Sequence, residues 1–297
     1  MTRCQLSLLT GALLLPWSVL AHGSLLTDKP VSQLLREKSS EIAALKVEAS
    51  KLGADLSLEP YSNDVFFLRY CLDDVKVPID TTIQWRLGEG KPVWAAALQG
   101  TRGKQQSWNS TLQATPTASS VISKYIDPSN CMTTVTSKGD LVYCIRAGMI
   151  EDQALMQDLN TVDPMVQFFL YIKEVNMVEA NRLSLKTNRL VSVITANDLT
   201  GIQLMGGDSR FRSALTQSSQ KASTLYPNLS GPTLLLNLPR FLGAVSKLFT
   251  PFIPPSVKQK LRFENGPLSK VKTLVDISND GNERDQFLQQ LDKLVYN

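Results

Sequence analysis

Few residues in this chain have the side-chain chemistry of a catalytic centre. The only histidine among 297 residues is His22, which stands between the small residues Ala21 and Gly23 near the N-terminus. A Ser-His-Asp triad, a Cys-His pair and a histidine-based metal centre each need a histidine within the folded body of the protein. We therefore expect that the chain is not an enzyme, and we assign no catalytic residue, no metal ion and no cofactor.

The cysteines do not form a recognisable redox or zinc motif. Cys4 lies in an apolar N-terminal segment, which leaves Cys71, Cys131 and Cys144 for the rest of the chain. Three widely spaced cysteines are neither a disulfide framework nor a zinc site. One pair could still form a disulfide in an oxidising compartment.

A glycine-rich stretch resembles a phosphate-binding loop only in part. Gly201 and Gly206 have the spacing of a Walker loop, but Gly207 and Asp208 stand where its lysine and its Ser or Thr would be. Those two side chains are the groups that hold phosphate and magnesium. The sequence therefore gives little support to a nucleotide-dependent enzyme.

The most informative stretch for function runs over residues 226–263. Residues 233–238 form a short apolar run between turn residues, which is typical of a strand buried on both faces. Pro239 can occupy the first turn of a helix and Pro251 ends one, so a helix is predicted between them. Its apolar face consists of Phe241, Leu242, Val245, Leu248 and Phe249, and the apolar character continues through Phe252 and Ile253.

Cations flank this apolar helix and the short strand predicted after it, and they are Arg240, Lys247, Lys258, Lys260 and Arg262. One interpretation is an ordinary helix of an α/β core with solvated charges beside it. The other is a movable apolar gate that meets a membrane.

The order of these motifs resembles the CRAL-TRIO domain family, which includes fungal phosphatidylinositol transfer proteins, the retinaldehyde-binding protein and the tocopherol transfer protein. The matching motifs are Tyr226-Pro227-Asn228, the strand ending Asn237-Leu238-Pro239, the aromatic helix up to Pro251-Phe252, and the turn Asp198-Leu199-Thr200-Gly201. Only the glutamate of the first motif is replaced, by Asn228. The resemblance implies an α/β sandwich with a mostly parallel sheet floor, an apolar gate helix and an N-terminal helical lobe.

Periodicity and capping residues predict the remaining elements. The predicted helices span residues 31–52, 63–70, 78–86, 93–98, 163–178, 208–222, 268–274 and 287–295, and the predicted strands span 141–145, where the sheet begins, and 189–195. Residues 100–103 are predicted to be a loop. The expected units are a signal peptide (1–23), an amphipathic helix (24–57), a helical lobe (58–125), a CRAL-TRIO lipid-binding domain (126–280) and a closing amphipathic helix (281–297).

The N-terminal segment predicts entry into the secretory pathway. Arg3 precedes an apolar stretch of about fifteen residues, which is the length of a signal peptide rather than of a membrane span. Its removal lowers the formal net charge from +4 to +3, which argues against a nucleic-acid partner. We expect the secretory pathway or the endoplasmic reticulum lumen. The alternatives are an uncleaved signal anchor, a plastid reached through a signal peptide, or a cytoplasmic protein at a membrane surface.

The resemblance also implies which residues contact lipid and membrane. The lipid-contacting set is Tyr143, Val193, Thr195, Leu199, Asn228, Leu236, Phe241, Val245, Phe249, Phe252, Ile253 and Lys260, and the membrane-contacting set is Arg240, Lys247, Lys258 and Arg262. Phosphatidylinositol binders of the family use the glutamate that Asn228 replaces, together with a lysine that Lys260 matches. Phosphatidylcholine binders use a serine and a threonine where this chain has Val193 and Thr195.

The sequence thus favours no single lipid headgroup, and a phospholipid or a sterol-like, tocopherol-like or retinoid-like ligand all stay open. The expected function is the binding, with possible transfer between membranes, of a hydrophobic lipid by a monomer that touches membranes transiently. The alternative is an interaction scaffold that keeps the fold without exchanging lipid.

Overall fold

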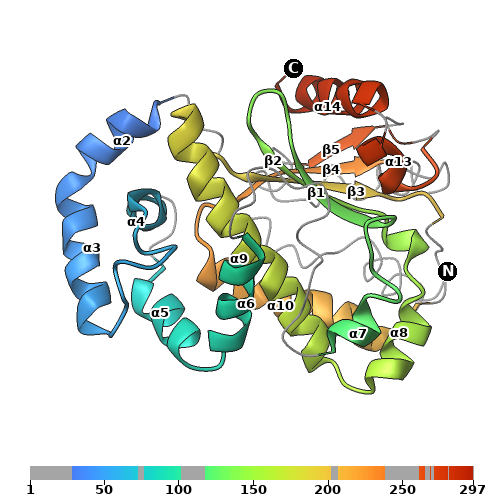
Figure 1. Cartoon of the computed structure of the whole chain (residues 1–297), viewed down its shortest axis with the longest axis horizontal. Helices are drawn as coiled ribbons and strands as arrows, with labels where there is room; N and C mark the ends of the chain where they lie inside the picture. Colours follow the sequence, from blue (N-terminus) through green and yellow to red (C-terminus); the bar gives the residue numbers. More distant parts are fainter. Residues whose placement is uncertain are drawn as a thin grey trace, which may run out of the picture.

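The computed structural model describes residues 29–72, 77–101, 118–201, 207–237, 261–264, 268, 271–279 and 281–296. Its centre is a five-stranded sheet with the strand order β1-β2-β3-β4-β5. Helices lie on both sides of the sheet, and a group of helices from the N-terminal part of the chain lies beside them (Figure 1). The predicted α/β class with a helical N-terminal lobe is therefore confirmed.

The sheet is mostly parallel, as expected. Its strands are β1 (Cys131–Val135), β2 (Leu141–Ile145), β3 (Val193–Asp198), β4 (Ser230–Leu236) and β5 (Leu261–Glu264). β1 pairs antiparallel with β2, and the other three pairs are parallel. The short connection from β1 to β2 can only form a hairpin, whereas the parallel pairs need longer crossovers.

Three strand predictions are corrected by the structure. The sheet begins with β1 rather than at Leu141, and β1 was missed because its residues are almost all buried and show no polar alternation. β3 begins at Val193 rather than at Arg189, since the amide of Val191 donates to Ser184 Oγ at 2.9 Å instead of to a strand. β4 begins at Ser230, before the apolar run.

The N-terminal lobe contains five described helices. They are α2 (Val31–Glu37), α3 (Ser39–Lys51), α4 (Asp64–Cys71), α5 (Ile79–Leu87) and α6 (Lys91–Thr101). The single helix predicted over 31–52 is wrong, because Lys38, with φ −103° and ψ 14°, separates α2 from α3. The start of α4 is confirmed, since Asn63 accepts a hydrogen bond from the amide of Val65.

The predicted loop at residues 100–103 is wrong at its start, because α6 continues through Gly100 to Thr101. A Cβ atom on Gly100 would lie 2.8 Å from the hydroxyl oxygen of Tyr171. The glycine therefore permits a close approach to another helix and does not end α6.

The helices that pack around the sheet are α7 (Ser119–Ile122), α8 (Asp152–Leu159), α9 (Asp163–Thr187), α10 (Ser209–Leu225), α13 (Leu274–Asn279) and α14 (Gly281–Tyr296), with a short 3₁₀ turn at Ala147–Met149. α9 is longer than the predicted 163–178, and Asp208 caps α10 by accepting from the amide of Arg210 at 2.7 Å. The helix predicted over 268–274 is wrong, because the helix in this region begins at Leu274. The carbonyls of Leu268 and Val271 accept hydrogen bonds from the Arg146 side chain instead.

The buried side chains form two clusters on opposite sides of the sheet. One cluster joins β1–β4 to α13 and α14 through Leu274, Ile277, Phe287, Leu288 and Leu291. The other joins the sheet to α8, α9 and α10 and continues into the N-terminal lobe. Figure 1 shows α14 on one side of the strands and α7, α8 and α10 on the other. The closing amphipathic helix thus packs against the body of the protein.

A buried ion pair joins the lobe to α9. Arg86 of α5 donates from Nε to Glu174 of α9 at 2.8 Å, and both side chains are completely buried. The guanidinium group also lies over the rings of Phe66 and Tyr61, at 5.0 and 5.6 Å from their centres. Burial alone would lower the pKa of Arg86, but the charge of Glu174 raises it above its ordinary value, so Arg86 stays charged.

A second arginine, Arg69 of α4, fixes the lobe to the chain near β3 and β4. It donates to Asn181 of α9 at 2.7 Å and to the carbonyls of Asn228 and Val191, both at 2.6 Å. Burial lowers the pKa of Arg69 to about 9, so it remains charged at neutral pH. Both connections bring polar groups from distant segments together at fixed positions.

The predicted gate helix between Pro239 and Pro251 lies outside the described residues. Within the described part of the chain, no helix combines the length and the apolar character needed to span a bilayer.

We expect Glu174→Gln to lower the free energy of unfolding by roughly 3–5 kcal/mol, because Arg86 would keep a buried charge without its counter-ion. Urea unfolding measures the change. The matched control is Glu41→Gln, whose half-exposed side chain pairs with Lys38 on the surface and should change stability by at most about 1 kcal/mol. Equal unfolding midpoints for the two variants would show that the buried pair contributes nothing.

Candidate lipid-binding face of the sheet

The pleat of the sheet separates its side chains into two faces. Val142 and Cys144 of β2 stand beside Ile194 and Ala196 of β3. All of them belong to the cluster that α13 and α14 cover, which we call the α14 face. Residues of odd number in β1–β3, such as Tyr143 and Thr195, point to the opposite side, because successive side chains alternate. That side packs toward α9 and is called the α9 face.

The two faces differ in how completely they are covered. On the α14 face Ile194, Ala196 and Leu234 are at most 1% exposed. On the α9 face Thr195 and Asn197 of β3 and Leu235 of β4 are only half-buried. Asn197 and Leu235 are paired neighbours in the two strands, so the less covered positions form one continuous area at the centre of the sheet.

A row of hydroxyl groups meets this area at Thr195, while its other three members are buried. Thr133 pairs with Tyr143, Tyr143 with Thr195, and Thr195 with Thr233, so these four side chains stand at one level on four strands. We call them the hydroxyl row. Hydroxyl groups can donate and accept, so the row can orient a polar group while the residues around it remain apolar.

The hydroxyl row carries no charge at neutral pH. The Cys131 thiol donates to the Tyr143 hydroxyl at 3.2 Å. Burial raises the pKa of Cys131 to about 12 and raises the pKa of Tyr143 well above its ordinary value. Both groups therefore stay protonated and serve as neutral hydrogen-bonding groups rather than as nucleophiles. None of the described cysteines, Cys71, Cys131 and Cys144, forms a disulfide.

A network centred on Arg146 holds the carboxyl ends of the parallel strands. Arg146 donates from Nε to Asp198 at 2.6 Å and from its terminal nitrogens to the carbonyls of Leu268, Val271 and Lys272. These bonds use the backbone that precedes α13. Arg146 therefore fixes the chain before α13 against the ends of β2 and β3.

Asp198 is also the acceptor for groups from two turns. The Thr200 hydroxyl donates to it at 2.7 Å and Asn237 Nδ2 donates to it at 2.8 Å. The aspartate of the Asp198-Leu199-Thr200-Gly201 motif and the asparagine after β4 are thus bound to each other. Asn197 precedes this carboxylate in β3, and its buried Nδ2 has no acceptor among the described residues.

The structure brings together only some of the residues predicted to contact lipid. Tyr143, Val193 and Thr195 share the α9 face, and Leu199 is buried in the turn after β3. Leu236 lies on the α14 face, where it belongs to the cluster that α13 and α14 cover. Asn228 contacts the N-terminal lobe, because its side-chain amide donates to the Arg69 carbonyl of α4 at 2.7 Å.

The predicted gate and membrane residues cannot be placed in the same way. Nine of them lie outside the described residues, namely Phe241, Val245, Phe249, Phe252, Ile253, Lys260, Arg240, Lys247 and Lys258. Arg262 is described only as part of β5. Their predicted contacts stay predictions.

Sequence reasoning missed several residues of the α9 face. Thr133 and Thr233 were not selected, and neither were the half-buried Asn197 and Leu235. For Asn197 a signal was available, because Thr195 and Asn197 are polar residues two positions apart that alternate with the apolar Ile194 and Ala196.

The chain was compared with known proteins. Residues 121–279, more than half of the chain, match the CRAL/TRIO domain. Among solved structures, the crystal structure of Sfh5 is similar, with a TM-score of 0.39 and 17% sequence identity over 62% of this chain and 58% of that chain. The match thus covers less than two thirds of the length of that structure. No curated protein matches the chain.

Proposed function

Since the chain belongs to the CRAL/TRIO domain family, we propose that it binds a hydrophobic lipid on the α9 face of its sheet and transfers it between membranes. The observation that carries this proposal is the unequal cover of the two faces, with Thr195, Asn197 and Leu235 half-buried beside completely buried neighbours. A binding role fits a site whose hydroxyl and thiol groups stay neutral.

The α9 face has the composition of a site for an amphipathic ligand. Lipid sites are mostly apolar, with a few polar groups that fix the orientation of the ligand. Ile145 and Leu235 provide apolar area beside the hydroxyl row. In this proposal the hydrocarbon part of the ligand covers the apolar side chains, and its polar part meets the row or the amide of Asn197.

Release of such a ligand needs an opening, and we assign it to the helix predicted between Pro239 and Pro251. Exposing one Phe or Leu side chain to water costs about 1.5–3 kcal/mol, so about six of them would cost on the order of 9–18 kcal/mol. The helix should therefore stay closed in water. Against a bilayer the same side chains meet acyl chains, and Arg240, Lys247, Lys258 and Arg262 would each add roughly 1 kcal/mol of attraction to anionic lipid.

Lipid that stays bound during purification tests the α9 face as the binding site. The chain purified from eukaryotic cells should yield about one lipid per protein on extraction and mass spectrometry. Thr195→Trp should reduce that yield several-fold, because the indole would fill the less covered part of the α9 face. Leu185→Trp, at an exposed position of α9, is the matched control and should retain the lipid. A lipid-free protein that also takes up none from liposomes would instead support the interaction scaffold.

A charged side chain in the predicted helix tests the gate. Phe249→Asp should slow lipid transfer between vesicles by about ten- to a hundredfold, since a carboxylate cannot take the place of an apolar side chain in the bilayer. Leu58→Asp, at an exposed position of the lobe, is the control and should transfer at the normal rate. An unchanged rate for Phe249→Asp would remove the gate from the proposal.

We also propose that residues 1–23 direct the chain into the secretory pathway. The support is the basic residue, the apolar stretch and the small residues that follow it. A fluorescent reporter fused behind residues 1–30 should appear in the endoplasmic reticulum or the medium. A reporter that stays in the cytosol would contradict this assignment.

A further inference from the structure

Two polar side chains of α9 have no partner within the described protein. Asn176 is completely buried, and neither its amide nitrogen nor its amide oxygen has a hydrogen-bond partner. Lys173, one turn earlier, is half-buried, and no described residue forms an ion pair or a hydrogen bond with its ammonium group. An unpartnered amide that is completely buried is costly, so Asn176 requires an explanation.

Both side chains lie away from the N-terminal lobe. Glu174 marks the lobe side of α9, because it pairs with Arg86. An α-helix turns by about 100° per residue, so Asn176 is about 200° from Glu174, on the opposite side. Lys173 is about 60° from Asn176 and lies on its flank.

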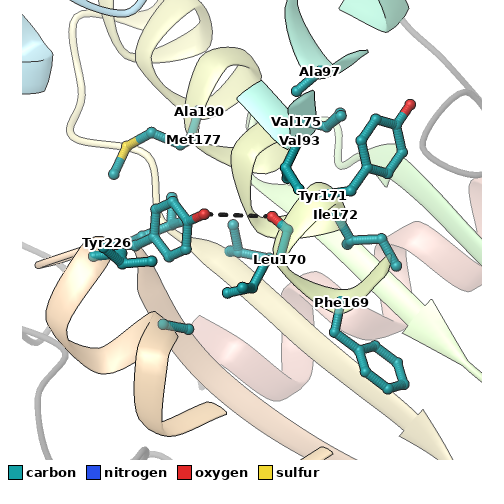
Figure 2. Packing of buried hydrophobic residues seen from close by; sticks show 14 of the residues in the cluster. Val93, Ala97, Phe169, Leu170, Tyr171, Ile172, Val175, Met177, Ala180 and Tyr226 are labelled. Carbon is teal, nitrogen blue, oxygen red and sulfur yellow. Dashed lines mark hydrogen bonds between the residues drawn. The ribbon is translucent and has the colours of Figure 1, made fainter. Parts of the chain in front are cut away.

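Phe169 identifies what this side of α9 faces. It is seven residues before Asn176 and four before Lys173, so all three share one side of the helix. The Phe169 ring packs against Phe211 of α10, with 5.9 Å between the ring centres. In Figure 2, Phe169 projects from α9 on the side opposite to Val93 and Ala97 of α6. This side therefore faces α10, and Phe169 belongs to the same buried cluster as Tyr143 and Val193 of the sheet.

The position of Asn176 along α9 matches that of Thr195 along β3. The C-terminal end of α9 and the chain just before β3 meet where the amide of Val191 donates to Ser184 Oγ, and α9 and β3 lie on opposite sides of that corner along the chain. Asn176 is about 12 Å from Ser184 along the helix, and Thr195 is about 13 Å from Val191 along the strand. The unpartnered amide and the hydroxyl row thus stand at comparable distances from the corner.

We propose that Lys173 and Asn176 form a subsite for an acidic group of the lipid, a carboxylate or a phosphate. The ammonium group supplies the counter-charge, and the Asn176 amide donates to an oxygen of the same group. This inference rests on the proposed lipid binding and adds the class of lipid. Burial lowers the pKa of the Lys173 ammonium, which agrees with a cation that has no counter-ion among the described residues.

The test measures binding of three probes to the delipidated full chain. Oleate carries a carboxylate, oleoyl lysophosphatidate carries a phosphate, and monooleoylglycerol has the same acyl chain without a charge. Lys173→Met keeps the length of the side chain and removes its charge. It should weaken binding of the better acidic probe by about tenfold and change binding of monooleoylglycerol by less than about twofold. Lys173→Arg should retain most of the acidic affinity.

The control is Lys186→Met, at an exposed position of the same helix, which should bind all three probes normally. If Lys173→Met does not fold, Asn176→Leu takes its place in the comparison. Equal loss of acidic and neutral probes, or no preference of the unmodified chain for either acidic probe, would overturn the subsite. Failure of the unmodified chain to bind any of the three would instead overturn the proposed lipid binding.

Discussion

The candidate site depends on the alternation of side chains across the pleated sheet, combined with unequal cover of its two faces. α13 and α14 seal one face so completely that Ala196 and Leu234 have no exposed surface. The other face shares a cluster with α9, yet Thr195 and Asn197 remain half-buried. Along β3 the half-buried Thr195 and Asn197 alternate with the buried Ala196. The difference in burial is therefore a difference between the two faces of the sheet.

Three buried arginines hold the framework around that face. Arg69 and Arg86 attach the lobe to α9 and to the chain near β3 and β4, and Arg146 attaches the chain before α13 to Asp198. A buried charge is tolerated only when its partners are correctly placed, so each arginine specifies one arrangement of distant segments. Lys173 differs from these three, since it is only half-buried and no described residue pairs with its charge. That contrast is the reason for assigning it to a ligand.

Much of the framework could be predicted from sequence, because motifs and caps act locally. Asn63 and Asp208 cap α4 and α10 where those helices were predicted to start, and the mostly parallel sheet follows from strands separated by helices. The position of a side chain on one face or the other was harder to predict. In Leu234-Leu235-Leu236 all residues are alike, and a shift of one residue exchanges the faces, so Leu236 was selected where Leu235 is the half-buried residue.

Other features depend on tertiary contacts that a sequence does not display. Gly100 looked like a helix end, and its closeness to Tyr171 became clear only from the structure. Asn228 looked like a ligand residue of the family motif, whereas its amide binds the backbone of Arg69. That the buried amide of Asn176 has no partner among the described residues likewise has no signal in the sequence.

The most direct measurement is to map where a lipid lies. A fatty acid with a photoactivatable diazirine in its acyl chain can be bound to the protein, irradiated and located by mass spectrometry. The account predicts adducts on the α9 face, at Tyr143, Thr195 or Leu235. Adducts confined to the α14 face or to the outer surface of the helices would contradict it.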